Sequence, residues 1–425
     1  MKPLTARELE RLRAEGQEVR QVLPNRIALE RINEHRRAKG LRELAPSTAA
    51  AVGEEVVGPG LRAPAEVASF AVLPSHVDNS VLDFFPPIRS QGSIGSCTAW
   101  ATTYYQLSHT VALQYGWDAK HNTDNTRLFS PKWTYNFINN GVDQGSSIFA
   151  AYNLLERQGA TTWATSPYDS NYTSWPLDPA VYRGALPYRT NAVQYITQAS
   201  TPDGLQRIKE LLANGYVLVY GTYVNSWQGM PIKNDPSTPD DDAFVGRSVT
   251  YWQNGFNGSH AMTIVGYDDT LWADINRNNV VDPGEKGALR IANSWGTGWN
   301  EGGFTWVAYD ALNSVSAVTG GPSTGRVGLF QGNLVYHATV RPNYTPKLVA
   351  EVKVSSLRRN QLGLSVGISE VGFGMPAATF QDAVAWAGEE GGLLLGEGED
   401  GPQDGGRARR WWLDGRPGRG AGRGT

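Results

Sequence analysis

The only cysteine of this chain, Cys97, ends the run Gln91-Gly-Ser-Ile-Gly-Ser-Cys97, and His260 and Asn293 follow much later. A thiolate that attacks a carbonyl carbon needs a proton shuttle and hydrogen-bond donors for the developing oxyanion. Cys97 and His260 can form a thiolate–imidazolium pair, and Asn293 can accept from the other imidazole nitrogen. The Gln91 side chain and the Cys97 backbone N–H can donate to the oxyanion. These residue types therefore predict nucleophilic acyl chemistry at Cys97.

Each of these residues taken alone has a simpler interpretation. A free cysteine is commonly a buried and inert thiol. An isolated histidine such as His260 is usually structural, Asn293 can cap a turn, and a glutamine such as Gln91 is common in loops. Only the motifs around these residues favour a catalytic interpretation.

Three motifs in one order resemble those of the papain-like cysteine peptidases, over roughly residues 73–310. The first is the run from Gln91 through Cys97-Thr-Ala-Trp100. The second is Gly-Ser-His260-Ala-Met-Thr-Ile-Val-Gly-Tyr267, and the third is Ile-Ala-Asn293-Ser-Trp-Gly-Thr-Gly-Trp-Asn-Glu-Gly-Gly-Phe304. One such motif would be a weak signal, but three in sequence are specific.

The resemblance implies an α+β fold with a helical left lobe that bears Cys97 and a β-rich right lobe that bears His260 and Asn293. It implies hydrolysis of a peptide or protein substrate through a thioester acyl-enzyme at Cys97, with Gln91 in the oxyanion hole. Such catalysis requires no cofactor. The family's thiol has a depressed pKa, and papain is one of the known examples of that effect.

The same resemblance implies which residues bind the substrate. The segment Asp143-Gln-Gly145-Ser146 resembles the family's Gly-Gly segment, whose backbone pairs with an extended peptide. Trp295, two residues after Asn293, is expected to shield the His260–Asn293 hydrogen bond from water and to border the cleft. The start at Leu73 resembles a mature N-terminus, which makes residues 1–72 a candidate propeptide and the protein a candidate zymogen.

The chain departs from the family pattern at several positions. Ile94 stands where a disulfide-forming cysteine is usual, Ser259 stands before the histidine in place of aspartate, and Ser146 replaces a glycine. The spacings from Cys97 to His260 and to Asn293 also exceed the usual range. Ser259 is expected to alter the pH profile, whereas Ser146 keeps the backbone donor and acceptor.

The pattern of apolar residues predicts the elements that carry these groups. A helical face over residues 97–115 places Cys97 at a helix N-terminus, where free N–H groups and the macrodipole favour a thiolate. Further helices are predicted over residues 146–158 and 203–214. Short β-type runs occur at 216–220, 260–265, 288–292 and 304–309, bounded by glycine, asparagine or aspartate. Helices first and strands later favour an α+β fold with a cleft between two lobes.

Composition divides the chain into four parts. Residues 1–72 read as a helical pro-region and linker, since a helix-rich start gives way near residue 45 to Ala, Gly, Pro, Glu and Ser. Residues 73–342 form the catalytic domain. Residues 343–387 form a short β-rich accessory segment, in which 347–354 and 362–368 are predicted to pair as a hairpin. Residues 388–425 are Gly/Arg-rich and are predicted to be disordered.

The interval between His260 and Asn293 contains a candidate calcium loop. Oxygen-bearing side chains occupy positions one, three, five, nine and twelve of a twelve-residue run, and Val280 would offer its carbonyl at position seven. Asn279 replaces the usual glycine at position six, which asparagine tolerates. The predicted ligands of a structural Ca²⁺ are Asp274, Asn276, Asn278, Val280, Asp282 and Glu285.

The charge balance and the single cysteine limit the partners and the compartment. A net charge of −3 over 425 residues gives no case for nucleic acid or an acidic membrane, so we expect a monomer that binds neither. No apolar run approaches the roughly 20 residues of a membrane span. No signal peptide is visible, and the absence of disulfides fits a cytoplasmic compartment without excluding secretion.

Three functions fit the motif set. The favoured one is a cysteine peptidase, either endopeptidase or exopeptidase. The second is a thiol acyltransferase that uses the same triad, against which Gln91 and the Asn-Ser-Trp-Gly run argue. The third is a catalytically silent papain-like binding module. The intact set of nucleophile, base and orienting residue argues against this last function, because silent relatives usually lose the nucleophile.

Overall fold

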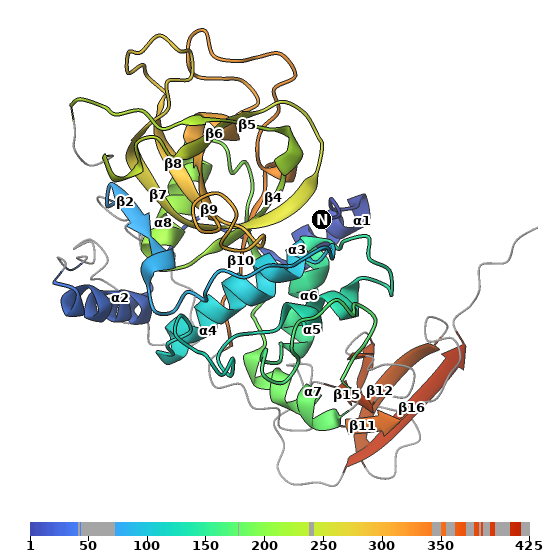
Figure 1. The fold of residues 1–425 in the computed structure, drawn as a ribbon. Helices are drawn as coiled ribbons and strands as arrows, with labels where there is room; N and C mark the ends of the chain where they lie inside the picture. Colours follow the sequence, from blue (N-terminus) through green and yellow to red (C-terminus); the bar gives the residue numbers. More distant parts are fainter. Residues whose placement is uncertain are drawn as a thin grey trace, which may run out of the picture.

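The computed structural model describes residues 1–40, 43, 73–176, 178–237 and 242–341, and short backbone strands between residues 350 and 417. Its two main parts are a group of helices and a large, strongly curved sheet (Figure 1). The chain builds the helical part first and most of the sheet afterwards, which is the order expected for the α+β class. The expected arrangement of a helical lobe against a β-rich lobe is therefore present.

The helical lobe is built around one long helix that begins at the thiol. It starts as α3 (Cys97–Ala99), continues as a π-helix (Trp100–Leu107) and ends as α4 (Ser108–Tyr115). Gly116 ends it in the left-handed conformation, with φ of 68°, which glycine adopts without a Cβ penalty. The predicted helix over 97–115 is confirmed, with a π-helical middle that periodicity does not distinguish.

Shorter helices surround this long helix. They are α5 (Pro131–Ile138), α6 (Ile148–Gln158) and α7 (Pro179–Ala185), while α8 (Pro202–Ala213) covers the sheet. Each begins with a side-chain cap, and α6 is capped by Ser147, whose hydroxyl accepts from the Ala150 N–H at 3.1 Å. Such a cap satisfies one of the free N–H groups of the first turn. The cap fixes where the segment of residues 143–146 ends and α6 begins.

The β-rich lobe is a ten-stranded sheet within the described part of the chain, in the order β1-β3-β10-β4-β7-β8-β9-β6-β5, with β2 paired to β7. Its strands are β1 (Gln17–Glu18), β2 (His76–Asp78), β3 (Gln194–Ile196), β4 (Leu218–Tyr223), β5 (Trp227–Pro231), β6 (Ser248–Gln253), β7 (Ser259–Trp272), β8 (Lys286–Ala292), β9 (Phe304–Ala308) and β10 (Val335–His337). The predicted strands at 216–220, 260–265, 288–292 and 304–309 correspond to β4, β7, β8 and β9.

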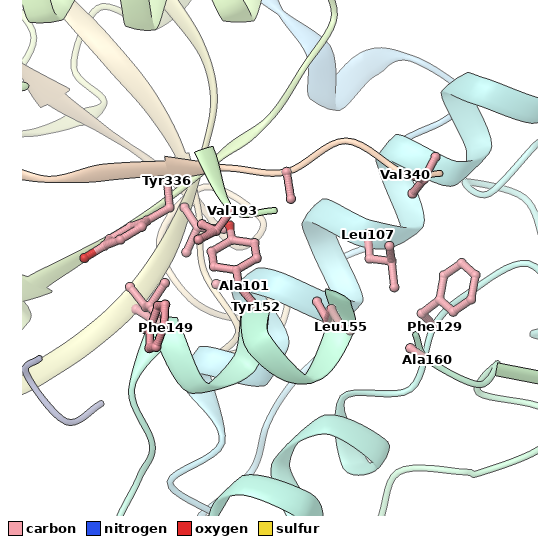
Figure 2. Packing of buried hydrophobic residues seen from close by; sticks show 14 of the residues in the cluster. Ala101, Leu107, Phe129, Phe149, Tyr152, Leu155, Ala160, Val193, Tyr336 and Val340 are labelled. Atoms are coloured by element: carbon pink, nitrogen blue, oxygen red, sulfur yellow. The ribbon is translucent and has the colours of Figure 1, made fainter. Parts of the chain in front are cut away.

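One apolar cluster joins the two lobes. Leu107 and Val111 of the long helix pack with Tyr152 and Leu155 of α6, and the cluster reaches Tyr336 of the sheet (Figure 2). Burying a side chain of this size contributes about 1.5–3 kcal/mol. The helix that carries the thiol is therefore anchored on the same core as the sheet.

The first 40 residues pack on this domain. Helix α1 (Ala6–Glu15) starts with a capping box between Thr5 and Glu8, and its Leu12 is fully buried in the cluster that joins the lobes. Strand β1 then pairs in parallel with β3. Helix α2 (Arg26–Ala38) buries Ile32 among residues of the long helix. The candidate pro-region is thus a docked part of the fold up to residue 40.

The C-terminal segment differs from the prediction in two ways. The predicted hairpin is wrong, because β11 (Ala350–Lys353) pairs with β15 (Gly392–Leu395), whereas β12 (Leu362–Glu370) pairs with β13 (Ala378–Gln381) and β16 (Arg409–Pro417). Strand β14 (Val384–Ala385) also pairs with β15. The second difference is that β15 and β16 lie in the range predicted to be disordered, because composition averaged over the tail hides the short apolar runs Leu-Leu-Leu and Trp-Trp-Leu.

No helix among the described residues has the length and apolar character that crossing a membrane requires.

Candidate active site

Cys97 is the first residue of the long helix and is almost completely buried, with 2% of its surface exposed. The N-cap residue, Ser96, makes no side-chain cap bond; its hydroxyl lies 2.6 Å from that of Tyr168. The first N–H groups of the helix therefore keep their positive ends near the thiol. The predicted place of Cys97 at a helix N-terminus is confirmed.

His260 and Asn293 come together because β7 and β8 are antiparallel neighbours. His260 is the second residue of β7, and Asn293 follows the last residue of β8, Ala292. The two side chains meet with 2.8 Å between His260 Nε2 and Asn293 Oδ1. Because Asn293 Oδ1 is an acceptor, Nε2 carries the hydrogen, which leaves Nδ1 of the ring for the thiol.

The thiol and the imidazole form a pair. Burial raises the pKa of Cys97, but the charge and the hydrogen bond of His260 lower it, as do the α-amino group of Met1 and the N–H of Ala261, so that the pKa falls from 9.0 to about 6. A thiol with this pKa is mostly ionised at neutral pH, and the thiolate is the nucleophilic form. The geometry thus produces an activated sulfur.

Trp295 covers the histidine. Its ring centroid lies 4.7 Å from that of His260 at an interplanar angle of 31°, and the edge of Trp299 packs against it. Trp295 is 37% exposed while His260 beneath it is 5% exposed. A hydrogen bond screened from water in this way is stronger than one in solvent. The predicted shielding position of Trp295 is therefore observed.

Gln91 is held between the two lobes. Its backbone N–H donates to Ser294 O at 2.8 Å, and its side-chain oxygen accepts from the Ser294 hydroxyl at 2.6 Å. Because the oxygen is fixed there, the amide nitrogen points the other way and donates to Ile94 O at 2.7 Å. An amide nitrogen has two hydrogens, so one of them is left in addition to this bond.

The substrate-pairing segment predicted at Gly145 and Ser146 lies beside the thiol. The Thr98 hydroxyl, one residue after Cys97, donates to Ser146 O at 2.9 Å. The same carbonyl accepts the backbone N–H of Lys2 at 2.9 Å. Gly145 has a backbone φ of 74°, a conformation that residues other than glycine and asparagine rarely adopt. The Ser146 carbonyl therefore accepts from a side chain of the long helix and from the backbone of residue 2.

The N-terminal residue lies against this segment. The Met1 amino group donates to Ser259 O, the carbonyl before His260, at 2.9 Å. A Cβ atom added at Gly145 would lie 3.4 Å from Met1 N, and one added at Gly221 would lie 2.5 Å from Met1 Cε. Met1 thus rests between Gly145 and Gly221 of β4, and the N-terminus lies near the start of α3 (Figure 1).

Two hollows flank the segment of residues 1–13. One has a volume of about 450 Å³ and is walled on the sheet side by Tyr195, Tyr223 and Leu334. The other, of about 480 Å³, is walled by α6 and by Ser146. Both are bordered by Lys2 and Pro3.

Sequence reasoning missed several contacts of the site. Thr98 and Ser294 lie inside the quoted motifs, so the runs around Cys97 and Asn293 signalled them without assigning a role. The contacts of Met1 with Ser259 and of Lys2 with Ser146 join residues 258 and 144 positions apart in the sequence. No local pattern in the sequence indicates such pairs.

The candidate calcium loop lies between β7 and β8, outside the cleft. The carboxylates at its two ends, Asp274 and Glu285, are 2% and 1% exposed. Glu285 accepts from the Ile275 N–H at 2.7 Å, and Asn279 has φ of 60°, as expected for the residue that replaces glycine.

The other candidate Ca²⁺ ligands of this loop form hydrogen bonds with one another. Asp282 accepts from the side-chain amides of Asn276 and Asn278, each at 2.7 Å, and the Val280 N–H donates to Asn278 Oδ1. No group of three or more His, Cys, Asp or Glu side chains in the described residues is arranged to hold a metal ion. The donor types are those of a hard cation, and Ca²⁺ binding stays a prediction.

Comparisons with known proteins give matches among solved structures only. No family profile and no curated protein matches the chain. Xylellain, a cysteine protease from Xylella fastidiosa, is 23% identical, with a TM-score of 0.40, over 64% of this chain and 88% of that chain. The Amb a 11 cysteine protease, a ragweed pollen allergen, is 16% identical in its proform, with a TM-score of 0.42, over 64% and 67%. The bromelain protease of Ananas comosus in complex with the E64 inhibitor is 15% identical, with a TM-score of 0.42, over 63% and 100%.

Proposed function

We propose that this protein is a papain-like cysteine peptidase that hydrolyses peptide bonds through a thioester at Cys97. The proposal is carried by the way these three residues act on one another. His260 lowers the pKa of Cys97 to about 6, and Asn293 Oδ1 orients His260 through a hydrogen bond of 2.8 Å. A structural thiol needs neither feature. A buried thiol without a charged partner has a raised pKa and is inert.

Each side chain has a distinct part in the reaction. The Cys97 thiolate attacks the carbonyl carbon of the scissile bond, and the oxyanion that forms accepts hydrogen bonds from the Cys97 N–H and from Gln91. The protonated His260 then gives its proton to the leaving amine, and the C–N bond breaks to leave a thioester. Water, deprotonated by the neutral His260, attacks that thioester and releases the acid and the thiolate.

The proposed substrate is an extended peptide, and two backbone carbonyls support this choice. Ser146 O and Ser259 O are acceptors on the two sides of the thiol, and both pair with main-chain donors of residues 1–2. A substrate strand would use the same carbonyls, as in other modes of recognition by strand addition. Trp295 borders this cleft from the histidine side.

The same contacts support a latent state. Met1 and Lys2 hold the acceptors that a substrate needs, and α1 behind them is fixed by the bond of Ser147 Oγ to Glu8 Oε1 at 2.5 Å. Because Leu12 and Ile32 are buried, residues 6–40 are built into the domain. We infer that activation requires withdrawal of about the first four residues only, while the rest of the segment stays docked.

The silent-module and acyltransferase alternatives are less well supported. A silent module has no use for a thiol ionised at neutral pH. An acyltransferase would use the same triad but must exclude water from the thioester, and Gln91 and the Asn-Ser-Trp-Gly run argue against that reaction. Incubation with an amine acceptor distinguishes them: a peptidase gives mainly the free acid, and an acyltransferase gives mainly the amide.

The test of the function is peptide cleavage by the full chain and by a variant that lacks residues 2–4. We expect the shortened protein to cleave casein and peptide reporters, and Cys97→Ala and His260→Ala to abolish cleavage. Ser96→Ala is the matched control for a small change beside the nucleophile. Cleavage that survives Cys97→Ala, or a shortened protein that is folded but inert, would contradict the proposal.

We also propose that the loop of residues 274–285 binds Ca²⁺ as a stabilising site. The support is the twelve-residue spacing, the burial of Asp274 and Glu285 and the left-handed Asn279. Two buried carboxylates are costly without a compensating charge, and Lys233 is the ion-pair partner of Asp274, at 3.5 Å. The ion would hold the hairpin between the strands that carry His260 and Asn293.

A further inference from the structure

Asp143 connects the loop before the thiol to the substrate-pairing segment. Its Oδ1 atom accepts the backbone N–H of Gly95 at 2.8 Å and the hydroxyl of Tyr135 at 2.5 Å. The Tyr135 oxygen in turn accepts the N–H of Gly145 at 3.3 Å. One carboxylate oxygen and one phenol thereby join Gly95, two residues before Cys97, to Gly145, one residue before Ser146.

The two backbone segments approach closely at this junction. A Cβ atom at position 95 would lie 3.1 Å from Gly145 N and 3.2 Å from Asp143 Oδ1. Glycine at 95 therefore permits the contact. Ile94, beside it, is buried against Tyr135 in a small cluster. The junction is thus packed by apolar groups and joined by polar ones.

Tyr135 is a fixed donor in this arrangement. Burial, together with its hydrogen bond to Asp143, raises the pKa of Tyr135, so its hydroxyl keeps its proton at neutral pH. A hydrogen bond to a charged acceptor is stronger than one between neutral groups. The Asp143–Tyr135 bond is accordingly the firm part of the junction.

A second contact lies on the other side of the thiol. The Thr98 hydroxyl donates to Ser146 O at 2.9 Å, so the cysteine lies between two connections to the same segment. The distance from sulfur to a bound peptide depends on both. Misplacement of reacting groups by about 1 Å can cost roughly 100-fold in rate.

We propose that Asp143 is a positioning residue, which sets the register between the Cys97 sulfur and the backbone of a bound peptide through Gly95 and Tyr135. The proposal rests on the peptidase function given above. Asp143 itself is exposed, so its removal deletes no core packing. A merely structural surface residue would change peptide reaction and small-molecule reaction at the thiol equally, or neither.

The experiment compares two reagents on the full chain and on the variant that lacks residues 2–4, in which the Lys2 N–H no longer pairs with Ser146 O. Iodoacetamide reacts with any accessible thiolate, whereas a peptidyl epoxysuccinyl reagent must also pair with the cleft backbone. The variants are Asp143→Ala and Asp143→Asn, and the second keeps an acceptor oxygen. The matched control is Asp118→Ala, because the Asp118 carboxylate also accepts a backbone N–H, that of His121. Rates are measured for each by mass spectrometry, with thermal midpoints beside them.

We expect Asp143→Ala to slow the peptidyl reagent about tenfold or more, with iodoacetamide within about twofold of wild type, and Asp143→Asn to restore most of the rate. Asp118→Ala should change neither reagent. Equal loss for both reagents, no loss for the peptidyl reagent, or no recovery in Asp143→Asn would overturn the proposal. Failure of the peptidase function would appear separately, as absence of turnover in the wild-type protein lacking residues 2–4.

Discussion

His260 Nε2 lies 2.8 Å from Asn293 Oδ1, and the same oxygen accepts the Ser294 N–H at 2.7 Å. Two donors on one side hold the amide so that its oxygen faces the ring. The amide nitrogen of Asn293 is buried and has no hydrogen-bond partner among the described residues. An unpaired buried donor costs free energy, so the orientation of His260 is maintained at some expense to stability.

Replacing Asn293 by alanine should therefore reduce catalysis. Hydrogen bonds to charged groups contribute about 1.5–3 kcal/mol, which corresponds to a fall in kcat/KM of about 10- to 100-fold. KM should change less than kcat, because the ring orientation matters most as the proton moves. Asn191→Ala, which removes an exposed amide bonded to Thr339 at 2.8 Å, is the control. Unchanged kcat in Asn293→Ala would remove Asn293 from the mechanism.

The latent state can be tested at one backbone hydrogen. Lys2→Pro deletes the N–H that donates to Ser146 O at 2.9 Å, whereas Lys2→Ala keeps it and removes only the side chain. A net backbone hydrogen bond is worth about 1 kcal/mol, so we expect labelling of Cys97 by a peptidyl reagent to rise about fivefold in Lys2→Pro. Lys2→Ala should behave as wild type. An equal rise in both variants would assign the effect to the side chain.

The sequence predicted those parts of the site in which residue types and local context are sufficient. Cys97 at a helix start, His260 at a strand start and Trp295 beside Asn293 each follow from a motif of a few residues. The antiparallel pairing of β7 with β8, which brings His260 to Asn293, is shown by the structure alone.

Other features depend on contacts between distant segments. The docking of Met1 at Ser259 and of α1 on α6 requires surfaces that exist only after folding. Helix periodicity over residues 1–40 indicated helices but not their partner. In the C-terminal segment, β11 and β12 were predicted as strands, yet their partners lie in a tail that average composition marked as disordered.

Calcium should raise the thermal midpoint of the protein if the loop of residues 274–285 binds it. Binding to the folded state alone stabilises by RT ln(1 + [L]/Kd), about 2.7 kcal/mol at a concentration of 100 Kd. We expect chelator to lower the midpoint of wild type, added Ca²⁺ to restore it, and Asp274→Ala to be insensitive to both. Asp203→Ala, in the first turn of α8, is the control. A wild-type thermal midpoint that neither calcium nor chelator changes would reject the site.

Acid should destabilise the fold through His109. This side chain is fully buried, and burial lowers its pKa from 6.5 to about 4, although its bond to Gly215 O works in the opposite direction. Below pH 6.5 the unfolded chain binds a proton that the folded chain excludes, so stability falls as the pH drops toward about 4. The resulting loss in the free energy of unfolding is at most about 3 kcal/mol. In urea titrations His109→Gln should show a shallower fall over this range, and an equal slope would exclude His109 as the cause.

The most direct test of the central claim, a sulfur ionised by the facing imidazole, is the pH dependence of Cys97 alkylation in wild type and in His260→Ala. The account predicts a wild-type rate that rises through a pKa of about 6 and a transition in His260→Ala that moves above pH 8, toward or beyond the value of an ordinary thiol. A wild-type thiol that titrates near 9, or two proteins with the same profile, would contradict it.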